Sequence, residues 1–565
     1  MLEPAPSANI ARHLSAMAAI QPERAALKVA QGRTRRGDID YLTLSFRALD
    51  AEVDAWLQRL TNAGVRRGDR TLVMVRQGLP LIAAAFALFK LGAVPVIIDP
   101  GMGLKNFLAC VEQSRPRALV GITLAQLISH VARRAFSSVS VRVVASGSMT
   151  ACMRPIRHAP GRDQIAACAV SPRDLAAILF TSGSTGKPKG VCYEHGMFEA
   201  QIRLIQRTYQ IQPGEIDLPM LPIFALFNPA LGMTTIVPEI DPRRPASVDP
   251  QKIVQAIQQE NVTNSFGSPT LWRKIGDHCV THKITLASLR RVLCAGAPVP
   301  TALWESSRSW MTSGRLHSPY GATEALPVSS VSSDEIAASR GGIGACVGRA
   351  VAETEVRIIG IVDAPIASIT AAEKKAVGEI GEIIVHGPTV TQRYDGADAA
   401  SAMAKISGVP ASSLRADSSD PTISAEARAW HRMGDCGYVD AEGRLWFCGR
   451  KVERVETERE TLYTEPCEQV FREHPGVTRC ALVGLGPRGQ QRPAIVIESS
   501  LRTSKDLIAL AAALRARANG HAVTRMITRF YFHPRFPVDV RHNAKIHRLA
   551  LARWAVKARP FDVEA

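Results

Sequence analysis

Several patterns that would restrict the chemistry of this chain are missing from its sequence. The eleven cysteines include no Cys-x-x-Cys pair and are odd in number. The sequence therefore shows neither the ligand spacing of a zinc site nor a closed set of disulfides. Reduced thiols are typical of a cytoplasmic protein, and we predict that location.

Long apolar runs are missing as well. The longest apolar stretch, Leu79–Ile98, is interrupted by a lysine, a glycine and a proline. It is too broken for a membrane span and predicts instead a buried helix over Leu79–Leu91 and a strand over Val94–Ile98. The first twenty residues contain early prolines and no basic segment followed by an apolar one, so they do not resemble a secretion signal.

Aromatic residues are scarce, at 5%, and they do not interleave with basic residues. The net charge is +18, but lysine and arginine are spread along the chain rather than gathered in one run. Nucleic-acid binding is therefore disfavoured. A basic cleft for an anionic substrate fits this charge better, with most of the basic side chains on the solvated surface.

The length of 565 residues exceeds what one hydrophobic core can organise, so we expect two or more domains. Ser45–Ala63 predicts an amphipathic helix capped by Ser45, and Arg70–Val75 predicts a strand. Helical and strand patterns alternate over most of the first 400 residues. That alternation is typical of parallel sheets covered by helices and predicts an α/β fold.

The pattern changes after Gly449-Arg450, where short strands are predicted at Cys480–Gly484, Ala494–Ile497 and Arg529–Phe532. We predict a large domain over residues 1–450 and a small α+β domain over residues 451–565. Within the large domain, Gly408–Ala429 is rich in Ser, Ala and Asp and predicts an exposed insertion.

The most informative segment follows an apolar strand at Ala176–Phe180. It places hydroxyls and lysines between glycines, namely Thr181, Ser182, Gly183, Ser184, Thr185, Gly186, Lys187, Lys189 and Gly190. Glycines let backbone N–H groups turn toward an anion, and the hydroxyls and lysines add donors and positive charge. The loop lacks the Gly-Lys-Ser/Thr ending of a Walker loop. We predict that it binds nucleotide phosphates; the alternative is a flexible surface turn.

This string, Thr-Ser-Gly-Ser-Thr-Gly-Lys-Pro-Lys-Gly, resembles the phosphate loop of the adenylate-forming superfamily, which includes acyl-CoA synthetases, adenylation domains and luciferases. The resemblance covers about residues 20–555. It implies a large N-terminal domain, a mobile C-terminal lid, and a reaction that joins a carboxylate to ATP. Thr181 to Lys187 would bind ATP, and Thr185 and Lys189 would take part in catalysis.

Two further motifs extend the resemblance. Tyr320-Gly321-Ala-Thr323-Glu324 resembles the family's Tyr-Gly-x-Thr-Glu. It implies that Tyr320 stacks on adenine, that Thr323 bonds the α-phosphate and that Glu324 holds Mg²⁺. A lone Thr-Glu also marks a helix start. The upstream Gly296, Ala297 and Pro298 resemble the segment that borders adenine.

The segment His431-Arg-Met-Gly-Asp435 resembles a family motif that contacts the ribose of the nucleotide. The resemblance implies that Asp435 accepts hydrogen bonds from ribose hydroxyls. Met433 stands where the family has threonine. Arg450 would lie near the ribose and phosphate. Gly378–Glu382 resembles a family motif that we interpret as a turn.

Lys545 corresponds to the family's lid lysine, which meets the α-phosphate and the substrate carboxylate. A mobile lysine there can offset charge that grows during attack on phosphorus. The alternative is a surface lysine.

The chain departs from CoA-using members after Arg450. The hinge falls near Val452, and the usual Gly-Gly turn is replaced by Glu456, Thr457 and Glu458. That turn lines the pantetheine tunnel in the family, so bulky acidic residues there disfavour CoA as the acceptor.

The chain is most similar to the β-lactone synthetase branch of bacterial long-chain olefin biosynthesis. Four segments carry this similarity: Leu221–Gly232, Gly267–Thr270, His431–Arg454 and Phe536–Lys545. The branch adenylates a 2-alkyl-3-hydroxyalkanoic acid, whose own 3-hydroxyl then closes a four-membered lactone and releases AMP. An internal nucleophile replaces a second substrate through its high effective concentration.

The apolar side chains of Phe224, Phe227 and Leu231 are candidates to line a tunnel for alkyl chains, with Gly267 and Ser268 as its wall. Plain core packing is the alternative for each. His195 and His542 are candidates only for the base that takes the hydroxyl proton, and a structural role is favoured for both.

Two other functions stay open from the sequence. One is a fatty acyl-CoA or acyl-carrier ligase, which would need a thiol acceptor. The other is an inactive nucleotide-binding scaffold, which the joint presence of Lys187, Glu324, Asp435 and Lys545 disfavours. The olefin-pathway resemblance implies thiolase-like, reductase and lactone-decarboxylase partners, and ATP and Mg²⁺ as cosubstrate and cofactor.

Overall fold

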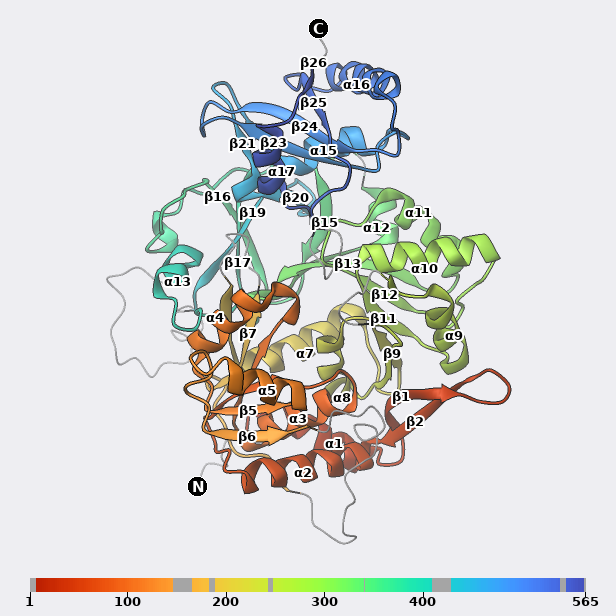
Figure 1. Cartoon of the computed structure of the whole chain (residues 1–565), viewed down its shortest axis with the longest axis vertical. Helices are drawn as coiled ribbons and strands as arrows, with labels where there is room; N and C mark the ends of the chain where they lie inside the picture. The colour runs from red at the N-terminus through yellow and green to blue at the C-terminus, as the bar shows by residue number, and fades with distance from the viewer. Residues whose placement is uncertain are drawn as a thin grey trace.

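A computed structural model describes residues 7–145, 165–181, 188–241, 247–339, 341–408, 428–538 and 545–562 (Figure 1). It contains a six-stranded sheet, a fourteen-stranded sheet, a short hairpin and a four-stranded sheet. The four-stranded sheet is built from the C-terminal part of the chain and lies at the top of Figure 1, above the antiparallel end of the largest sheet. The predicted α/β class is confirmed.

The six-stranded sheet has the order β6-β5-β3-β4-β7-β8. Its strands are β3 (Arg70–Met74), β4 (Val94–Ile98), β5 (Ala118–Gly121), β6 (Val141–Val144), β7 (Leu175–Thr181) and β8 (Lys189–Glu194). All neighbours are parallel except β7 and β8. Parallel neighbours need crossover connections: α3 (Leu79–Leu91) connects β3 to β4 and α5 (Thr123–Val131) connects β5 to β6, while α4 (Leu104–Ser114) leads from β4 past β3 to β5.

The helices predicted in this region are confirmed. Helix α2 (Phe46–Asn62) begins at Ser45, whose hydroxyl accepts a hydrogen bond from the Ala48 N–H at 3.2 Å. Helix α3 is buried around most of its circumference. Lys90, which interrupts the apolar run, is buried and is neutralised by Asp50 at 3.3 Å and Asp54 at 2.5 Å. A buried cation is tolerated there because two carboxylates of α2 face it.

Among the described residues, no helix combines the length and apolar character that crossing a membrane requires. The ten cysteines within this part of the chain are all free thiols.

The fourteen-stranded sheet has the order β16-β17-β19-β20-β15-β14-β13-β12-β11-β9-β10-β1-β2, with β18 beside β19. The strands from β13 to β1 in this order are parallel: β1 (Ala25–Arg33), β9 (Ile216–Pro219), β10 (Thr234–Val237), β11 (Asn264–Gly267), β12 (Arg291–Cys294) and β13 (Arg315–Ala322).

The remaining strands of this sheet are antiparallel to their neighbours. They are β2 (Ile39–Ser45), β14 (Ala325–Ser332), β15 (Ala345–Ala350), β16 (Glu355–Ile359), β17 (Gly381–His386), β18 (Lys405–Ile406), β19 (Trp430–Val439) and β20 (Leu445–Arg450). The predicted turn at Gly378 is confirmed: its φ is +84°, and the Glu379 N–H donates to the Ala376 carbonyl at 3.1 Å just before β17.

The other helices of the large part cover these two sheets. They are α1 (Arg12–Ile20), α7 (His195–Tyr209), α8 (Asn228–Leu231), α9 (Pro250–Glu260), α10 (Pro269–His282), α11 (Thr301–Trp310), α12 (Ser333–Ala338) and α13 (Asp398–Ala404). Helices α10 and α11 meet through the stacked rings of Trp272 and Trp310, whose centroids are 5.5 Å apart. The parallel strands β11, β12 and β13 end side by side, and loops at such carboxyl ends commonly bind ligands.

The C-terminal sheet has the order β23-β24-β25-β26. Its elements are β23 (Arg479–Leu485), β24 (Arg492–Glu498), β25 (Arg529–Phe532), β26 (Phe561–Asp562), α15 (Thr464–Arg472), α16 (Ser504–Asn519) and α17 (Arg548–Ala555), preceded by the hairpin β21 (Val455–Glu456) and β22 (Thr461–Leu462). Each face of the sheet has its own buried cluster. The three strands predicted here are confirmed. The proposed boundary at residue 450 falls at the end of β20, and the proposed insertion lies, except for Gly408 and residues 428–429, outside the described residues.

Candidate active site

Three residues predicted from separate motifs come together near the end of β13, in the middle of β19 and at the end of β20. The Tyr320 hydroxyl donates to Asp435 Oδ2 at 2.6 Å. The Arg450 guanidinium lies 2.9 Å from Asp435 Oδ1. The Asp435 side chain is buried, so an arginine and a hydroxyl beside it reduce the cost of holding its charge.

Asp435 has room for one more partner. Its Oδ1 is buried and, despite the nearby arginine, accepts no hydrogen bond of good geometry within the described residues. Burial raises the pKa of the Asp435 carboxyl, and the charge of Arg450, the Tyr320 hydrogen bond and the charge of Lys545 offset part of that rise. An acceptor in this state suits a ribose hydroxyl. Lys545 is exposed, and its influence on Asp435 places it within electrostatic range of the same pocket.

Glu324 lies at the turn between β13 and β14 and is held by two residues that the sequence did not single out. The Tyr394 hydroxyl donates to Glu324 Oε1 at 2.8 Å, and both the N–H and the hydroxyl of Thr391 donate to the Glu324 carbonyl. The Thr323 carbonyl accepts from the Tyr193 hydroxyl at 2.5 Å. These bonds fix the Thr323-Glu324 turn from two sides.

Two lysines flank the ring of Tyr394. Lys189 Nζ is 4.9 Å and Lys405 Nζ is 5.9 Å from the ring centroid, and Lys405 also donates to the Thr391 hydroxyl at 2.9 Å. Burial lowers the pKa of Lys405 to about 7, against the attraction of Glu324. Lys405 was missed because no motif contains it; it reaches the site only through the short strand β18 beside β19.

The predicted phosphate loop connects β7 to β8, and its two ends meet because Thr181 pairs with Lys189 across the antiparallel ladder. Ser182, Gly183, Ser184, Thr185, Gly186 and Lys187 lie outside the described residues. Lys189, at the exit of the loop, is brought next to Tyr394 and hence to Glu324.

A divalent cation fits beside Glu324. Its Oε2 makes no hydrogen bond within the described residues, and a carboxylate oxygen is the ligand type that Mg²⁺ prefers. No group of three or more His, Cys, Asp or Glu side chains gathers as a metal site in the described part of the chain. A cation here would therefore take most of its remaining ligands from phosphate oxygens and water, as Mg²⁺ commonly does.

The adenine-border segment follows β12. Gly296 has φ +101°, and the Ala295 N–H donates to the Gly267 carbonyl at 3.0 Å. Ala297 and Pro298 continue this loop. A Cβ at Gly267, at the end of β11, would lie 2.3 Å from Met220 Cε, which can shift, and 2.9 Å from Nε1 of the stacked Trp272, so this position favours glycine. Gly321, on β13, is similarly confined, since its Cβ would lie 2.7 Å from the Ala325 carbonyl.

An apolar cavity of about 70 Å³ lies behind these loops, between α7, α8 and the sheet. Phe224, Phe227 and Leu231, the candidates for an alkyl-chain tunnel, line it together with Phe266, which stacks on Phe224 at 3.7 Å between centroids. Gly267 and Ser268 are not part of its lining; the Ser268 hydroxyl instead caps α10 by accepting from the Leu271 N–H.

The cavity has one carboxyl on its wall that the sequence did not reveal. Asp217 of β9 is buried, and its Oδ2 accepts from Asn228 Nδ2 at 2.8 Å. Burial raises the pKa of Asp217 to about 7; the Asn228 hydrogen bond opposes the rise and the Glu215 carboxylate adds to it. The alternation of Asp217 with apolar neighbours gave no sign that its side chain faces a cavity.

Neither histidine considered as a base is placed at the cavity. His195 is buried at the start of α7 with its ring edge-on to Phe89, and burial lowers its pKa to about 4. It is not among the residues that line the cavity. His542 lies outside the described residues.

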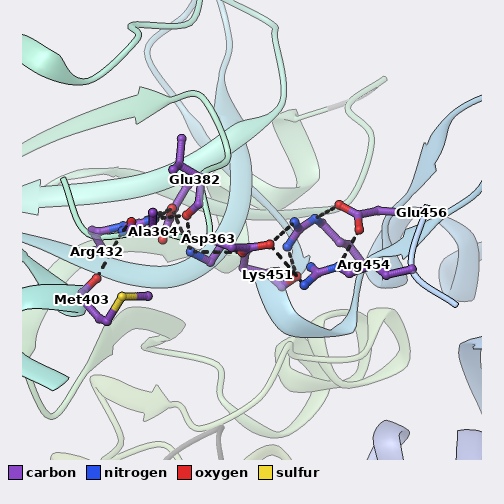
Figure 2. A network of polar contacts seen from close by, with 10 residues as sticks. Asp363, Ala364, Glu382, Met403, Arg432, Lys451, Arg454 and Glu456 are labelled. Atoms are coloured by element: carbon purple, nitrogen blue, oxygen red, sulfur yellow. Dashed lines mark hydrogen bonds and ion pairs between the residues drawn. The ribbon is translucent and has the colours of Figure 1, made fainter. Parts of the chain in front are cut away.

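A buried ionic cluster, shown in Figure 2, joins the antiparallel end of the large sheet to the segment after β20. Glu382 of β17 accepts from Arg432 of β19 at 2.6 Å and from Lys451 at 3.2 Å. Arg432 also donates to the carbonyls of Ala364 and Met403. The sequence predicted only a turn for Gly378–Glu382. It did not reveal the ionic role of Glu382, because its partners come from distant segments.

Comparison with known proteins shows which family the chain belongs to. The model of the AMP-binding enzyme family matches residues 14–395. The chain belongs to this family. It is 44% identical over 562 residues to an olefin beta-lactone synthetase of Xanthomonas campestris pv. campestris, with 98% of both proteins covered. It is 45% identical to an olefin beta-lactone synthetase of Stenotrophomonas maltophilia, covering 97% of this chain and 98% of that protein.

The fold is shared with solved structures of adenylate-forming enzymes. The amide bond synthetase McbA from Marinactinospora thermotolerans superposes with a TM-score of 0.75 at 22% identity, covering 97% of this chain and all of that chain. Family membership makes ATP the expected cosubstrate. The hydroxyl lost where Met433 replaces threonine is not needed to hold Asp435, since Met433 packs into a buried cluster while Tyr320 and Arg450 contact the carboxyl.

The raised pKa of Asp217 predicts a pH-dependent stability. Between about pH 4 and pH 7 the folded protein keeps a proton that the unfolded chain releases, so the contribution of Asp217 to the free energy of unfolding falls as pH rises through this range. Asp217→Asn removes this dependence. Its stability relative to the wild type should therefore increase from pH 4 to pH 7, by about 4 kcal/mol at most.

Thermal unfolding midpoints at pH 4.5, 5.5, 6.5 and 7.5 measure this difference, with the exposed Asp277→Asn as the matched control. A difference between Asp217→Asn and the wild type that stayed constant over this range would show that Asp217 is ionised in the folded protein.

Proposed function

We propose that this protein is an ATP-dependent β-lactone synthetase. It adenylates the carboxylate of a long-chain 2-alkyl-3-hydroxyalkanoic acid, and the 3-hydroxyl of the same molecule then closes the β-lactone. The observation that carries the adenylation of an apolar acid is that one strand, β13, contributes to both sites: Pro319 lines the apolar cavity, and Tyr320, whose side chain points to the opposite face of the sheet, bonds Asp435. The lactone-forming step rests on the two relatives named olefin beta-lactone synthetase.

In the first step, a carboxylate oxygen attacks the α-phosphorus of ATP and pyrophosphate leaves. Asp435 and Tyr320 hold the nucleoside end, and Lys545 offsets charge near the α-phosphate. Glu324 holds Mg²⁺, which would neutralise phosphate charge when bound. Lys189, near the Tyr394 ring, adds positive charge toward the departing pyrophosphate, and Lys405 adds a second charge when it is protonated.

In the second step, the 3-hydroxyl oxygen attacks the activated carbonyl carbon, the carbon–oxygen bond to AMP breaks, and the hydroxyl proton is lost. The nucleophile is already part of the substrate, so its effective concentration is high. The apolar cavity keeps the neighbouring alkyl chain out of water, and water near the adenylate would give hydrolysis instead.

A CoA ligase is the second candidate, and one contact disfavours it. Glu456 replaces a glycine of the pantetheine-lining turn, and its carboxylate is held by both Arg454 and Arg488. A thiol acceptor would have to displace these two ion pairs or pass beside them.

We also propose that residues 451–565 act as a mobile lid and that the protein works in the cytoplasm. Its pathway partners would be the enzymes that supply the β-hydroxy acid and consume the β-lactone of the olefin pathway.

Product analysis tests the proposal. The enzyme is incubated with ATP, Mg²⁺ and a synthetic 2-alkyl-3-hydroxyalkanoic acid, with and without CoA, and AMP and product mass are followed. We expect AMP and a product lighter than the acid by one water, formed equally without CoA. A thioester formed only with CoA would make the chain a CoA ligase.

Lys545→Ala should slow adenylate formation by about a hundredfold or more, because it removes a positive charge that acts mainly in the transition state. ATP binding should stay nearly unchanged. Pyrophosphate exchange and ATP titration measure the two quantities, and Lys557→Ala, an exposed lysine of the same C-terminal region, is the control. Wild-type exchange in Lys545→Ala would remove this lysine from the mechanism.

Glu324→Gln should raise the Mg²⁺ concentration needed for half-maximal activity, by about tenfold, because an amide oxygen is a weaker ligand for Mg²⁺ than a carboxylate. The exposed Glu353→Gln should behave as the wild type. Rates measured against Mg²⁺ at fixed ATP test this, and an unshifted curve for Glu324→Gln would show that Glu324 does not hold the metal.

A further inference from the structure

The ion network around residue 451 extends beyond the buried cluster and reaches across the proposed hinge. Asp363, on the loop after β16, belongs to the large part of the chain. Its carboxylate accepts from Arg454 at 3.1 Å and lies 3.1 Å from Arg488 and 3.9 Å from Lys451 (Figure 2). The Asp363 side chain is about half exposed, with 51% of its surface accessible, whereas Arg454 is 5% accessible.

Both arginines belong to the part of the chain beyond the hinge near Val452. Arg454 precedes β21, and Arg488 lies in the connection between β23 and β24. The same two arginines hold Glu456, so positive and negative groups alternate from Asp363 through Arg454 and Arg488 to Glu456. Although burial raises the pKa of Asp363, the hydrogen bond and charge of Arg454 and the charges of Arg488 and Lys451 lower it below its usual value.

A second set of contacts connects this segment to the lid lysine. Arg548, three residues after Lys545, donates to Glu453 at 3.0 Å and to both carboxylate oxygens of Glu468 at 2.7 Å. Glu453 is the residue next to Arg454. A continuous path of ion pairs and one covalent step therefore runs from Asp363 in the large part to the start of the helix that follows Lys545.

The path of ion pairs ends close in sequence to Lys545. The charge of Lys545 is one of those that lower the pKa of Asp435, so the lysine lies within electrostatic range of Asp435 in the same arrangement in which Asp363 holds Arg454 and Arg488. Rotation about residue 452 would carry both arginines and Lys545 with the lid, while Asp363 stayed behind. A rotation of the lid would therefore break the Asp363 ion pairs and displace Lys545 at the same time.

We propose that Asp363 is a positioning residue: through Arg454 and Arg488 it holds the lid in the orientation that places Lys545 at the α-phosphate. This inference rests on the proposed adenylation but not on lactone formation. An enzyme whose second nucleophile is part of its first substrate has no second acceptor to admit. A lid held in one orientation suits that chemistry.

A double-mutant cycle between Asp363 and Lys545 tests the proposal, with ATP–pyrophosphate exchange as the rate and ATP titration as the binding control. Asp363→Asn, which keeps the shape of the side chain, should lower the exchange rate about fivefold, since a half-exposed ion pair is individually weak. ATP affinity and the unfolding midpoint should stay as in the wild type. Arg488→Gln should give the same fall, and combining the two should add little.

The decisive variant is Asp363→Asn combined with Lys545→Ala. If Asp363 acts through the lysine, the double variant exchanges at the rate of Lys545→Ala alone. A further fivefold fall in that background would show a role independent of the lysine and overturn the proposal, as would wild-type exchange in Asp363→Asn. Glu353→Gln, which breaks the exposed pair with Arg203 away from the lid, is the matched control.

The exchange assay also separates this proposal from the proposed function. Exchange reports adenylate formation whatever becomes of the adenylate, so a thioester product would refute lactone synthesis and leave the cycle interpretable. A chain without any exchange would refute adenylation itself.

Discussion

The buried carboxylate of Asp435 is the interaction on which the candidate site depends. It lies on β19, and its two oxygens face Tyr320 from β13 and Arg450 from the end of β20. Because an ionised carboxylate inside a protein needs partners, the three strands are constrained to bring these side chains to one point. The same carboxylate lies within range of Lys545, which comes from the far C-terminal part of the chain. The proposed nucleotide site and the proposed lid thus share one charged group.

Much of the local structure could be predicted from the sequence. The helix Leu79–Leu91 and the strands Val94–Ile98 and Arg529–Phe532 have the predicted bounds, because each is a mostly apolar segment in a stretch divided by glycine or polar residues. The grouping of Tyr320, Asp435 and Arg450 followed from motif resemblance. The alternating pattern did predict parallel sheets with helices, but nothing in it specifies an order such as β9 between β10 and β11.

The residues that were missed have partners far away in the sequence. Tyr394 reaches Glu324 across 70 positions, Glu382 reaches Lys451 across 69, and Asp363 reaches Arg454 across 91. A single sequence contains no signal for such pairs, since each residue alone reads as an ordinary surface or strand residue. Asp217 is a further case. Its sequence context is that of an ordinary strand residue, and only its neighbours in space show that its carboxyl lies on the wall of an apolar cavity.

The segment after Arg450 combines two features of this chain: a glutamate held by two arginines, and an ion pair between the same arginines and Asp363. Glu456 is bound by Arg454 and Arg488, and these arginines also bind Asp363. These charges stand where the resemblance to CoA-using enzymes implies a glycine turn, and under our proposal they attach the lid to the large part. This agrees with a reaction in which the acyl acceptor is the substrate's own hydroxyl.

Activation of the carboxylate, rather than of the hydroxyl, is the central claim, and an isotope experiment tests it most directly. The hydroxy acid is labelled with ¹⁸O in its carboxylate, and AMP and lactone are analysed by mass spectrometry after one turnover. We predict one ¹⁸O atom in AMP and one in the lactone, because the carboxylate attacks the α-phosphorus and that oxygen leaves with AMP. AMP without label, with both ¹⁸O atoms retained in the lactone, would show that the hydroxyl is activated instead and would contradict the account.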